Sequence, residues 1–162
     1  MEYVYVYTND ESSIIFSDEE HSVKNMLEQF QKMTDVRRII VYKNHKKIYR
    51  FLKMKKRIYV ITYVDGLLEK FLYLNRDLEL TKAHYYDVHH QVGADTFNYI
   101  GNNLHGFQKM IILNRCYTVS FNHGRIRKMY IHDDGELVQI EYPKVLVDIM
   151  RHLDNEIRFT LK

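Results

Sequence analysis

The feature that most constrains the fold of this 162-residue chain is a repeated alternation of apolar and polar residues, broken at hairpin spacing. RIIVY turns through KNHK into KIYRFL, and RIYVITYV turns at Asp65-Gly66 into EKFLYLN. Alternate side chains of a strand point to opposite faces, and Asp-Gly favours a two-residue hairpin. KMIILNRCYTVSF, RIRKMYIH and ELVQIEY predict three more strands. The pattern therefore predicts antiparallel strands, not a parallel sheet whose strands alternate with helices.

Helical signals are confined to three short regions. After the strand EYVYVYT and a short strand SIIF, the stretch SDEEHSVKNMLEQFQKM predicts a helix with Ser17 as its cap. Val23, Met26, Leu27 and Phe30 form its apolar stripe. TFNYIGNNLHGF predicts a short internal helix that ends at a glycine. PKVLVDIMRHLDNEI predicts a C-terminal helix, with Pro143 at its first position.

These elements define an α+β class that is mainly β. We expect an elongated antiparallel β-rich domain over residues 38–162, with a short internal helix and a C-terminal helix. An acidic strand–helix segment, residues 1–37, precedes it. Hydrophobic residues make up 46% of the chain, enough for a core.

Composition also limits the compartment. The single cysteine, Cys116, excludes an internal disulfide and a multi-cysteine zinc site, which suits a reducing cytosol. The sequence contains no uninterrupted apolar run of membrane-spanning length and no basic start followed by an apolar run. We expect a soluble, cytoplasmic protein with no membrane contact.

Charge is strongly segregated along the chain. Residues 1–35 hold eight acidic and two basic residues, whereas residues 36–64 hold ten basic residues and no acid. Such a block attracts polyanions whatever the overall charge. It interleaves with Ile, Tyr and Phe, so the bases are expected to share one sheet face. The alternative is a basic surface neutralised by the acidic N-terminal segment.

One histidine-rich stretch suggests a metal-dependent nuclease. His89-His90, Gly93, Asn98 and Asn103-Leu104 follow the order of the HNH nuclease motif, and His84, Asp87 and His105 lie in the same stretch. Such an enzyme needs a divalent metal and a neutral histidine that activates water. No late histidine ligand is evident. Asp87, His89 and His90 are therefore the metal ligands of a minority interpretation, and simple loop histidines are the alternative.

Other catalytic signatures are absent from the sequence. It contains no Gly-rich phosphate loop, no serine nucleophile elbow and no CxxC pair. We expect no cofactor and no catalytic residue. Fourteen tyrosines could stack on single-stranded nucleic acid, although packing in alternating strands explains most of them more simply.

The stretch NRCYTVSF, followed by GRIRKM, a hairpin YIHDDGELVQIEY and the helix PKVLVDIM, resembles the end of the LytTR DNA-binding domain. RIIVYKNHKKIYRFL and RIYVITYVDGLLEKFLYLN are similar to the strands that precede it, and FNYIGNNLHGF stands where the family has a short helix. The resemblance covers about residues 38–153 and extends to small stand-alone regulators of this family.

The resemblance implies an elongated β domain whose loops enter successive major grooves of DNA. Arg115 would read guanine or clamp a phosphate, with Asn114 beside it, while Arg125, Arg127 and Lys128 would hold phosphates. Several positions depart from the pattern. Asn114 and Cys116 replace the family's His and Ser, Ser120 replaces an Asn, and Lys144 is the nearest base in place of Ser-Arg. The basic block adds Lys46, Lys47 and Arg50 as candidate contacts.

The sequence thus predicts a non-enzymatic, sequence-specific regulator that binds double-stranded DNA. Without a receiver domain, regulation would come through dimerisation, a protein partner or expression level. A protein-binding inhibitor or adaptor from a mobile element, acting on a partner that handles nucleic acid, is the second hypothesis. The nuclease is the third. A continuous exposed basic face would favour nucleic acid over the adaptor.

Overall fold

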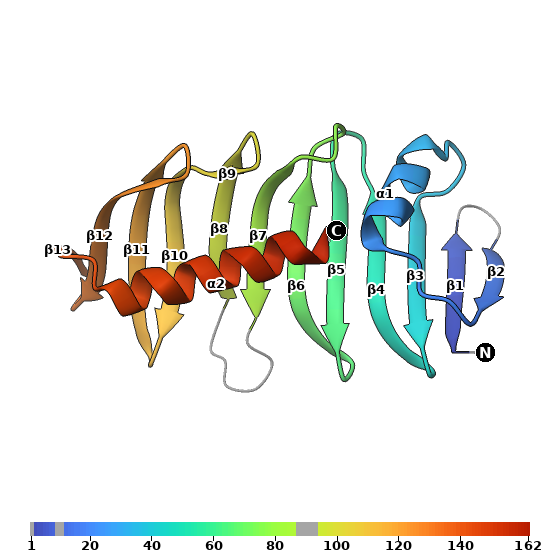
Figure 1. Cartoon of the computed structure of the whole chain (residues 1–162), viewed down its shortest axis with the longest axis horizontal. Helices are drawn as coiled ribbons and strands as arrows, with labels where there is room; N and C mark the ends of the chain where they lie inside the picture. Colours follow the sequence, from blue (N-terminus) through green and yellow to red (C-terminus); the bar gives the residue numbers. More distant parts are fainter. Residues whose placement is uncertain (1, 9–11, 87–93) are drawn as a thin grey trace.

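A computed structural model describes residues 2–8, 12–86 and 94–162. Over these ranges the chain forms one thirteen-stranded antiparallel sheet and two helices (Figure 1). The elements are, in chain order, β1 (Tyr3–Thr8), β2 (Ser12–Ser17), α1 (Val23–Lys32), β3 (Arg38–Lys43), β4 (Lys46–Lys53), β5 (Ile58–Val64), β6 (Leu67–Leu74), β7 (Leu80–Tyr86), β8 (Ala94–Ile100), β9 (Asn103–Leu104), β10 (Gly106–Ile112), β11 (Arg115–Asn122), β12 (Arg125–Asp133), β13 (Glu136–Ile140) and α2 (Lys144–Thr160). The α+β, mainly β class predicted from the sequence is confirmed.

The sheet follows the chain almost strand by strand. Its order is β13-β12-β11-β10-β8-β7-β6-β5-β4-β3-β1-β2, with the short β9 paired to β8. Figure 1 shows a long single layer with α2 lying diagonally across it and α1 over the end near β3 and β4. β1 pairs with β3, so the sheet continues across the boundary expected between residues 37 and 38.

The core lies between the sheet and the two helices. One row of directly opposed residues, which we call the core row, is almost completely buried: Ile39, Phe51, Val60, Leu72, Ala83 and Phe97. Phe30 of α1 packs edge-on against Phe51, with ring centroids 6.3 Å apart. Met150 and Ile157 of α2 belong to the same cluster. Neither helix of the described residues covers the opposite face, which we call the open face.

Three local predictions need correction. The short internal helix expected in TFNYIGNNLHGF is wrong, because this stretch forms β8, a turn and β9. Its buried residues alternate as they do in a strand, and Gly101 and Asn102 turn with positive φ. Ser22 caps α1 by accepting a hydrogen bond from the Asn25 amide, while Ser17 bonds the Glu19 amide instead. Pro143 is the N-cap of α2, one residue before its expected position.

A fourth prediction also needs correction, because KMIILNRCYTVSF is two strands. Leu113 and Asn114 both have positive φ and form a turn between β10 and β11. Leu113 is 92% exposed and is an unusual turn residue, which is why composition gave no signal of a hairpin here.

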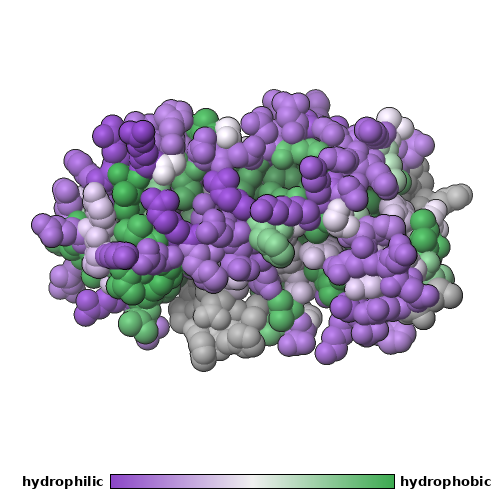
Figure 2. Space-filling view, in the orientation of Figure 1, coloured by the Kyte–Doolittle hydropathy of each residue, from purple (hydrophilic) through white to green (hydrophobic). Residues whose placement is uncertain are grey.

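No helix within the described residues is long and apolar enough to cross a membrane. Figure 2 shows the helix side of the molecule, which is largely hydrophilic with separate apolar clusters between purple regions.

Candidate nucleic-acid interface

The open face follows from the strand register. Phe51 points into the core, so its neighbours Arg50 and Leu52 point to the opposite face. Opposed residues of paired strands share a face, which extends this assignment from strand to strand. A central row of directly opposed residues crosses nine strands of the open face: Ile40, Arg50, Ile61, Phe71, His84, Thr96, Lys109, Thr118 and Tyr130.

A second row runs beside the central row and is also rich in basic and aromatic residues. Its members are Arg38, Leu52, Tyr59, Tyr73, Lys82 and Asn98. With strands about 4.8 Å apart, the central row is roughly 38 Å long. The two rows together form a broad polar–aromatic surface rather than a narrow cleft.

Aromatic side chains form a continuous cluster in the middle of the open face. Tyr59 and Tyr73 have ring centroids 5.1 Å apart, and Phe71 lies 5.4 Å from Tyr59 and 5.0 Å from Tyr73. Tyr73 then meets His84 at 5.6 Å, and His84 meets Tyr86 at 6.4 Å. All five rings are half-buried, so they shield one another while keeping part of each ring on the surface.

Basic side chains surround the aromatic cluster. Arg38, Lys47, Arg50, Lys82, Lys109 and Lys128 lie on the open face of β3, β4, β7, β10 and β12. Lys82 lies over the Tyr73 ring at 6.0 Å, and Lys47 over the Tyr63 ring at 5.2 Å. Within the described ranges, the open-face strand positions of β1, β3–β8 and β10–β12 include no Asp or Glu. The face therefore carries uncompensated positive charge.

The acidic N-terminal segment leaves most of the basic block unneutralised. Among the described residues, Lys43 pairs with Glu2 at 3.5 Å and Lys46 with Asp65 at 3.7 Å, and no other base of residues 36–64 forms an ion pair. Lys53 points to the helix side, where its Nζ donates to the carbonyls of Phe30 and Met33 at the end of α1. Some basic residues of this block therefore lie on the open face, whereas Lys53 caps the end of α1.

The nine residues predicted from the sequence to contact DNA lie in several separate places in the structure. Lys47, Arg50 and Lys128 lie on the open face, whereas Lys46, Asn114 and Arg115 lie at hairpin turns on one rim of the sheet. Arg125 also faces the open side, because it lies opposite Asn122, the neighbour of the buried Phe121. Arg127 lies at a bulge of β12, and Lys144 opens α2 on the helix side. β11 and β4 are six strand spacings apart, roughly 29 Å. These nine residues therefore do not form one site.

A β-bulge changes the strand alternation within this group. Phe121 pairs with Ile126 and Ser120 with Lys128, so Arg127 is an extra residue in β12. Strict alternation would have placed Arg125 and Arg127 on one strand face. The bulge breaks that alternation.

Register counting would have found residues that the sequence reasoning missed. Arg38, Lys82 and Lys109, together with Tyr59 and Tyr73, become neighbours only when the hairpins are aligned. Strand alternation in the sequence could have identified them. Each of these residues lies an odd number of positions from a core residue on its own strand, apart from local bulges.

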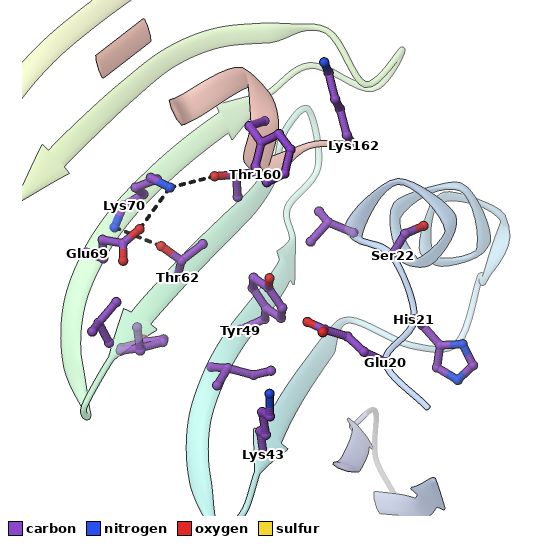
Figure 3. Close-up of a pocket in the computed structure, with 15 residues that line it drawn as sticks. Glu20, His21, Ser22, Lys43, Tyr49, Thr62, Glu69, Lys70, Thr160 and Lys162 are labelled. Carbon is purple, nitrogen blue, oxygen red and sulfur yellow. Dashed lines mark hydrogen bonds and ion pairs between the residues drawn. The ribbon is translucent and has the colours of Figure 1, made fainter. Parts of the chain in front are cut away.

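A cavity of about 570 Å³ lies on the helix side, between the start of α1, strands β4 to β6 and the end of α2 (Figure 3). Its lining mixes charges of both signs, including Glu20, Lys43, Glu69, Lys70 and Lys162. Burial raises the pKa of Tyr49 in this lining, and Glu20 and Glu69 act in the same direction. The Tyr49 phenol therefore stays protonated and neutral.

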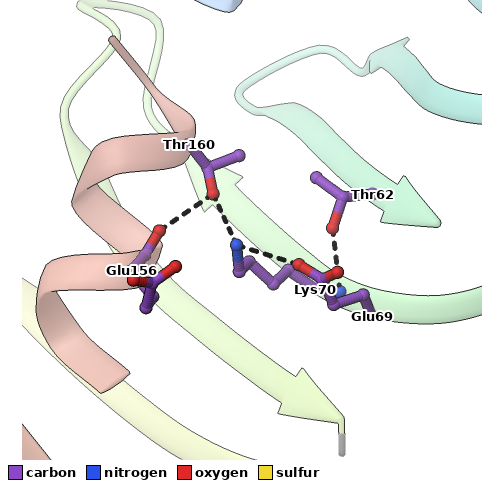
Figure 4. Close-up of polar contacts among 5 residues, drawn as sticks. All are labelled: Thr62, Glu69, Lys70, Glu156 and Thr160. Carbon is purple, nitrogen blue, oxygen red and sulfur yellow. Dashed lines mark hydrogen bonds and ion pairs between the residues drawn. The ribbon is translucent and has the colours of Figure 1, made fainter. Parts of the chain in front are cut away.

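Lys70 is a buried cation in the lining of this cavity, and both its ammonium group and its backbone amide have partners within the chain. Its Nζ lies 2.9 Å from Glu69 and 2.8 Å from the Thr160 hydroxyl, which itself donates to the Glu156 carbonyl (Figure 4). Its backbone amide donates to Thr62. These contacts tie the last turn of α2 to β6, a structural use of the charge.

Asp154 anchors the middle of α2 in a similar way. Its carboxylate accepts hydrogen bonds from the Tyr99 hydroxyl at 2.7 Å and from Arg158 Nε at 3.0 Å. Burial, reinforced by the Asp154 charge, raises the pKa of Tyr99 far above its ordinary value. Tyr99 is therefore a permanent hydrogen-bond donor.

The nuclease prediction falls largely outside the described residues. Asp87, His89 and His90 all lie between residues 86 and 94. Within the described ranges, no group of three His, Cys, Asp or Glu side chains is placed to hold a metal ion. His84 bonds the Thr96 hydroxyl at 3.0 Å, and His105 bonds the His123 amide at 3.1 Å.

No protein-family model matches this chain, and no curated protein matches it either. The strongest functional evidence is therefore the aromatic and basic composition of the open face.

Proposed function

We propose that this protein binds single-stranded nucleic acid on the open face of its sheet, without a catalytic step. The observation that carries the proposal is the combination of a contiguous aromatic cluster, six surrounding bases and no acid at the open-face strand positions described above. Aromatic rings stack on exposed bases, and lysine and arginine attract the phosphates.

The shape of the face favours a single strand over a duplex. The major groove is about 12 Å wide and admits a helix or a two-stranded ribbon, not a sheet face that is three times broader. Duplex DNA also keeps its bases stacked on one another, so the ring faces of Tyr59 and Tyr73 would gain no stacking partner. A single strand can lay its bases across the rows.

Binding of double-stranded DNA by a LytTR-like regulator is our second candidate. Asn114 and Arg115 favour it, because both are exposed at the turn between β10 and β11 and could enter a groove from the rim of the sheet. By strand parity Arg115 belongs to the helix-side face. The two candidates therefore use different surfaces.

Fluorescence anisotropy distinguishes the candidates. Labelled oligo-dT, oligo-U and a duplex would be titrated with the wild type, Tyr73→Ala and Arg115→Ala. The proposal predicts tighter binding to single strands, weakened by Tyr73→Ala and unchanged by Arg115→Ala. Preference for the duplex with loss in Arg115→Ala would support the regulator instead. Absence of binding to every probe would contradict both and favour an acidic protein partner, as in the adaptor hypothesis.

A further inference from the structure

Two arginines of the open face have buried hydrogen-bond donors without an acceptor. The Nε atoms of Arg38 and Arg50 are shielded from solvent and bond no group in the structure. A buried charged donor without an acceptor is costly, and such exceptions in folded proteins usually mark a place where water, an ion or a ligand binds. Neither Nε atom has an acceptor within the chain, and an oxygen from outside can bond them once the covering side chains move aside.

The surroundings explain why the chain itself supplies no acceptor. Across the strands, Arg50 is flanked by Ile40 and Ile61, and Arg38 has Leu52 as its neighbour on β4. These aliphatic side chains offer no oxygen, and Thr8, the neighbour of Arg38 on β1, forms no hydrogen bond with its Nε. Within the described ranges, no carboxylate occupies the open-face strand positions, so no described strand residue on this face competes for the guanidinium groups.

The two arginines are placed to act together. Arg38 on β3 lies opposite Leu52, and Arg50 is two residues before Leu52 on β4, so the two are diagonal neighbours on one face. Diagonal Cβ atoms in such a pair are about 7–8 Å apart, within the reach of two arginine side chains meeting at one group. A guanidinium fork matches the oxygens of a phosphate.

We propose that Arg38 and Arg50 form a phosphate subsite for the backbone of a bound single strand, an inference that rests on the proposed function. The subsite lies next to the aromatic cluster, because Tyr59 is the neighbour of Leu52 on β5. A phosphate held by the arginines would fix the register of the strand, and the adjoining base would stack on the Tyr59 side of the cluster.

Arginine-to-lysine variants test the subsite, because they keep the charge and remove both the fork and the Nε donor. Arg38→Lys and Arg50→Lys are each expected to weaken oligo-dT binding at least about tenfold, the effect of one lost charge-assisted hydrogen bond. Arg151→Lys is the matched control, since Arg151 is exposed on α2, on the helix side, and its variant should bind like the wild type.

Nuclear magnetic resonance of the arginine Nε–Hε groups gives a second readout that does not depend on how the variants fold. The wild-type resonances of Arg38 and Arg50 should shift on addition of oligo-dT, while that of Arg151 on α2 stays in place. If they respond to inorganic phosphate and not to oligo-dT, the site binds an adventitious ion only and the proposal is overturned.

The subsite and the proposed function fail in different ways. If wild-type protein binds oligo-dT but Arg38→Lys and Arg50→Lys match Arg151→Lys, the subsite is wrong and the proposed function stands. If the wild type binds no oligonucleotide, the proposed function fails and the subsite fails with it.

Discussion

The two faces of this sheet use charge in opposite ways. On the helix side, Lys53, Lys70 and Asp154 each have partners within the chain, and each fixes a helix to the sheet. On the open face, Arg38 and Arg50 have buried donors with no internal partner. Buried charges must be paired to be tolerated. The contrast shows that the charges of the helix side stabilise the fold, and it supports the proposal that the open face binds an external anion.

Two phenylalanines, one on each face, give the largest expected contrast. Phe97→Ala empties a fully buried core position and should lower the unfolding free energy by about 3–5 kcal/mol, measured by chemical denaturation. Phe71→Ala removes a half-buried ring of the open face and should destabilise the fold less.

The same pair should rank in reverse order for binding. Phe71→Ala is expected to lose about 1–3 kcal/mol of oligonucleotide affinity, as for the loss of one stacking ring. Phe97→Ala, assayed where it is still folded, should retain affinity. If the two substitutions lowered the unfolding free energy equally and the oligonucleotide affinity equally, the two faces would not differ in function.

Asp154→Ala tests the helix side alone. It leaves the Tyr99 hydroxyl and Arg158 without their acceptor, and should cost about 2–3 kcal/mol of unfolding free energy. Asp148→Ala removes a carboxylate at an exposed position of the same helix and should be nearly neutral. Thermal melts of the two variants make the comparison, and identical midpoints would show that the buried contact contributes nothing.

Lys82→Ala tests the charge of the open face through salt dependence. Loss of one phosphate contact should reduce the slope of log affinity against log salt by about 0.7 for a single strand. Lys55→Ala removes the same charge from an exposed turn between β4 and β5 and should leave the slope nearer to that of the wild type. Equal slopes for the two variants would mean that only net charge matters.

His84 gives the smallest expected effect, on the pH dependence of stability. Burial lowers the pKa of His84, and Lys82 lowers it further, so the folded state binds a proton less readily than the unfolded state. The stability from this group is present above the unfolded pKa of about 6.5 and is lost as pH falls from there through the folded pKa. His84→Gln should flatten this acid-side loss in denaturation curves, while His152→Gln on the exposed side of α2 should not.

Local sequence signals were sufficient for the class of the fold and insufficient for its surface. Alternation and the Asp65-Gly66 turn predicted the antiparallel strands, and the stripe from Val23 to Phe30 predicted α1. The turn at Leu113 and Asn114 has no common turn signature, so a hairpin was read there as one strand. The apolar and polar residues of β8 alternate as in a strand, but the glycine that follows led to the prediction of a short helix there.

The composition of the open face depends on long-range register, which local patterns do not contain. Arg38 and Lys82 are far apart in sequence and share one row only because four intervening pairings align them. Bulges at Ile48 and at Arg127 shift the alternation by one residue. Charge segregation correctly pointed to a basic surface, but it could not separate Lys53, which caps a helix, from Arg50, which faces outward.

Photocrosslinking tests the central claim most directly, because it maps the contact on the unmodified protein. Oligonucleotides containing 5-bromouracil would be bound, irradiated and digested, and the crosslinked peptides identified by mass spectrometry. We predict crosslinks at Tyr59, Phe71 and Tyr73, in the middle of the open face. Crosslinks confined to α2 or to the turn at Asn114 and Arg115 would contradict the account and move the nucleic-acid contact to the helix side or the rim.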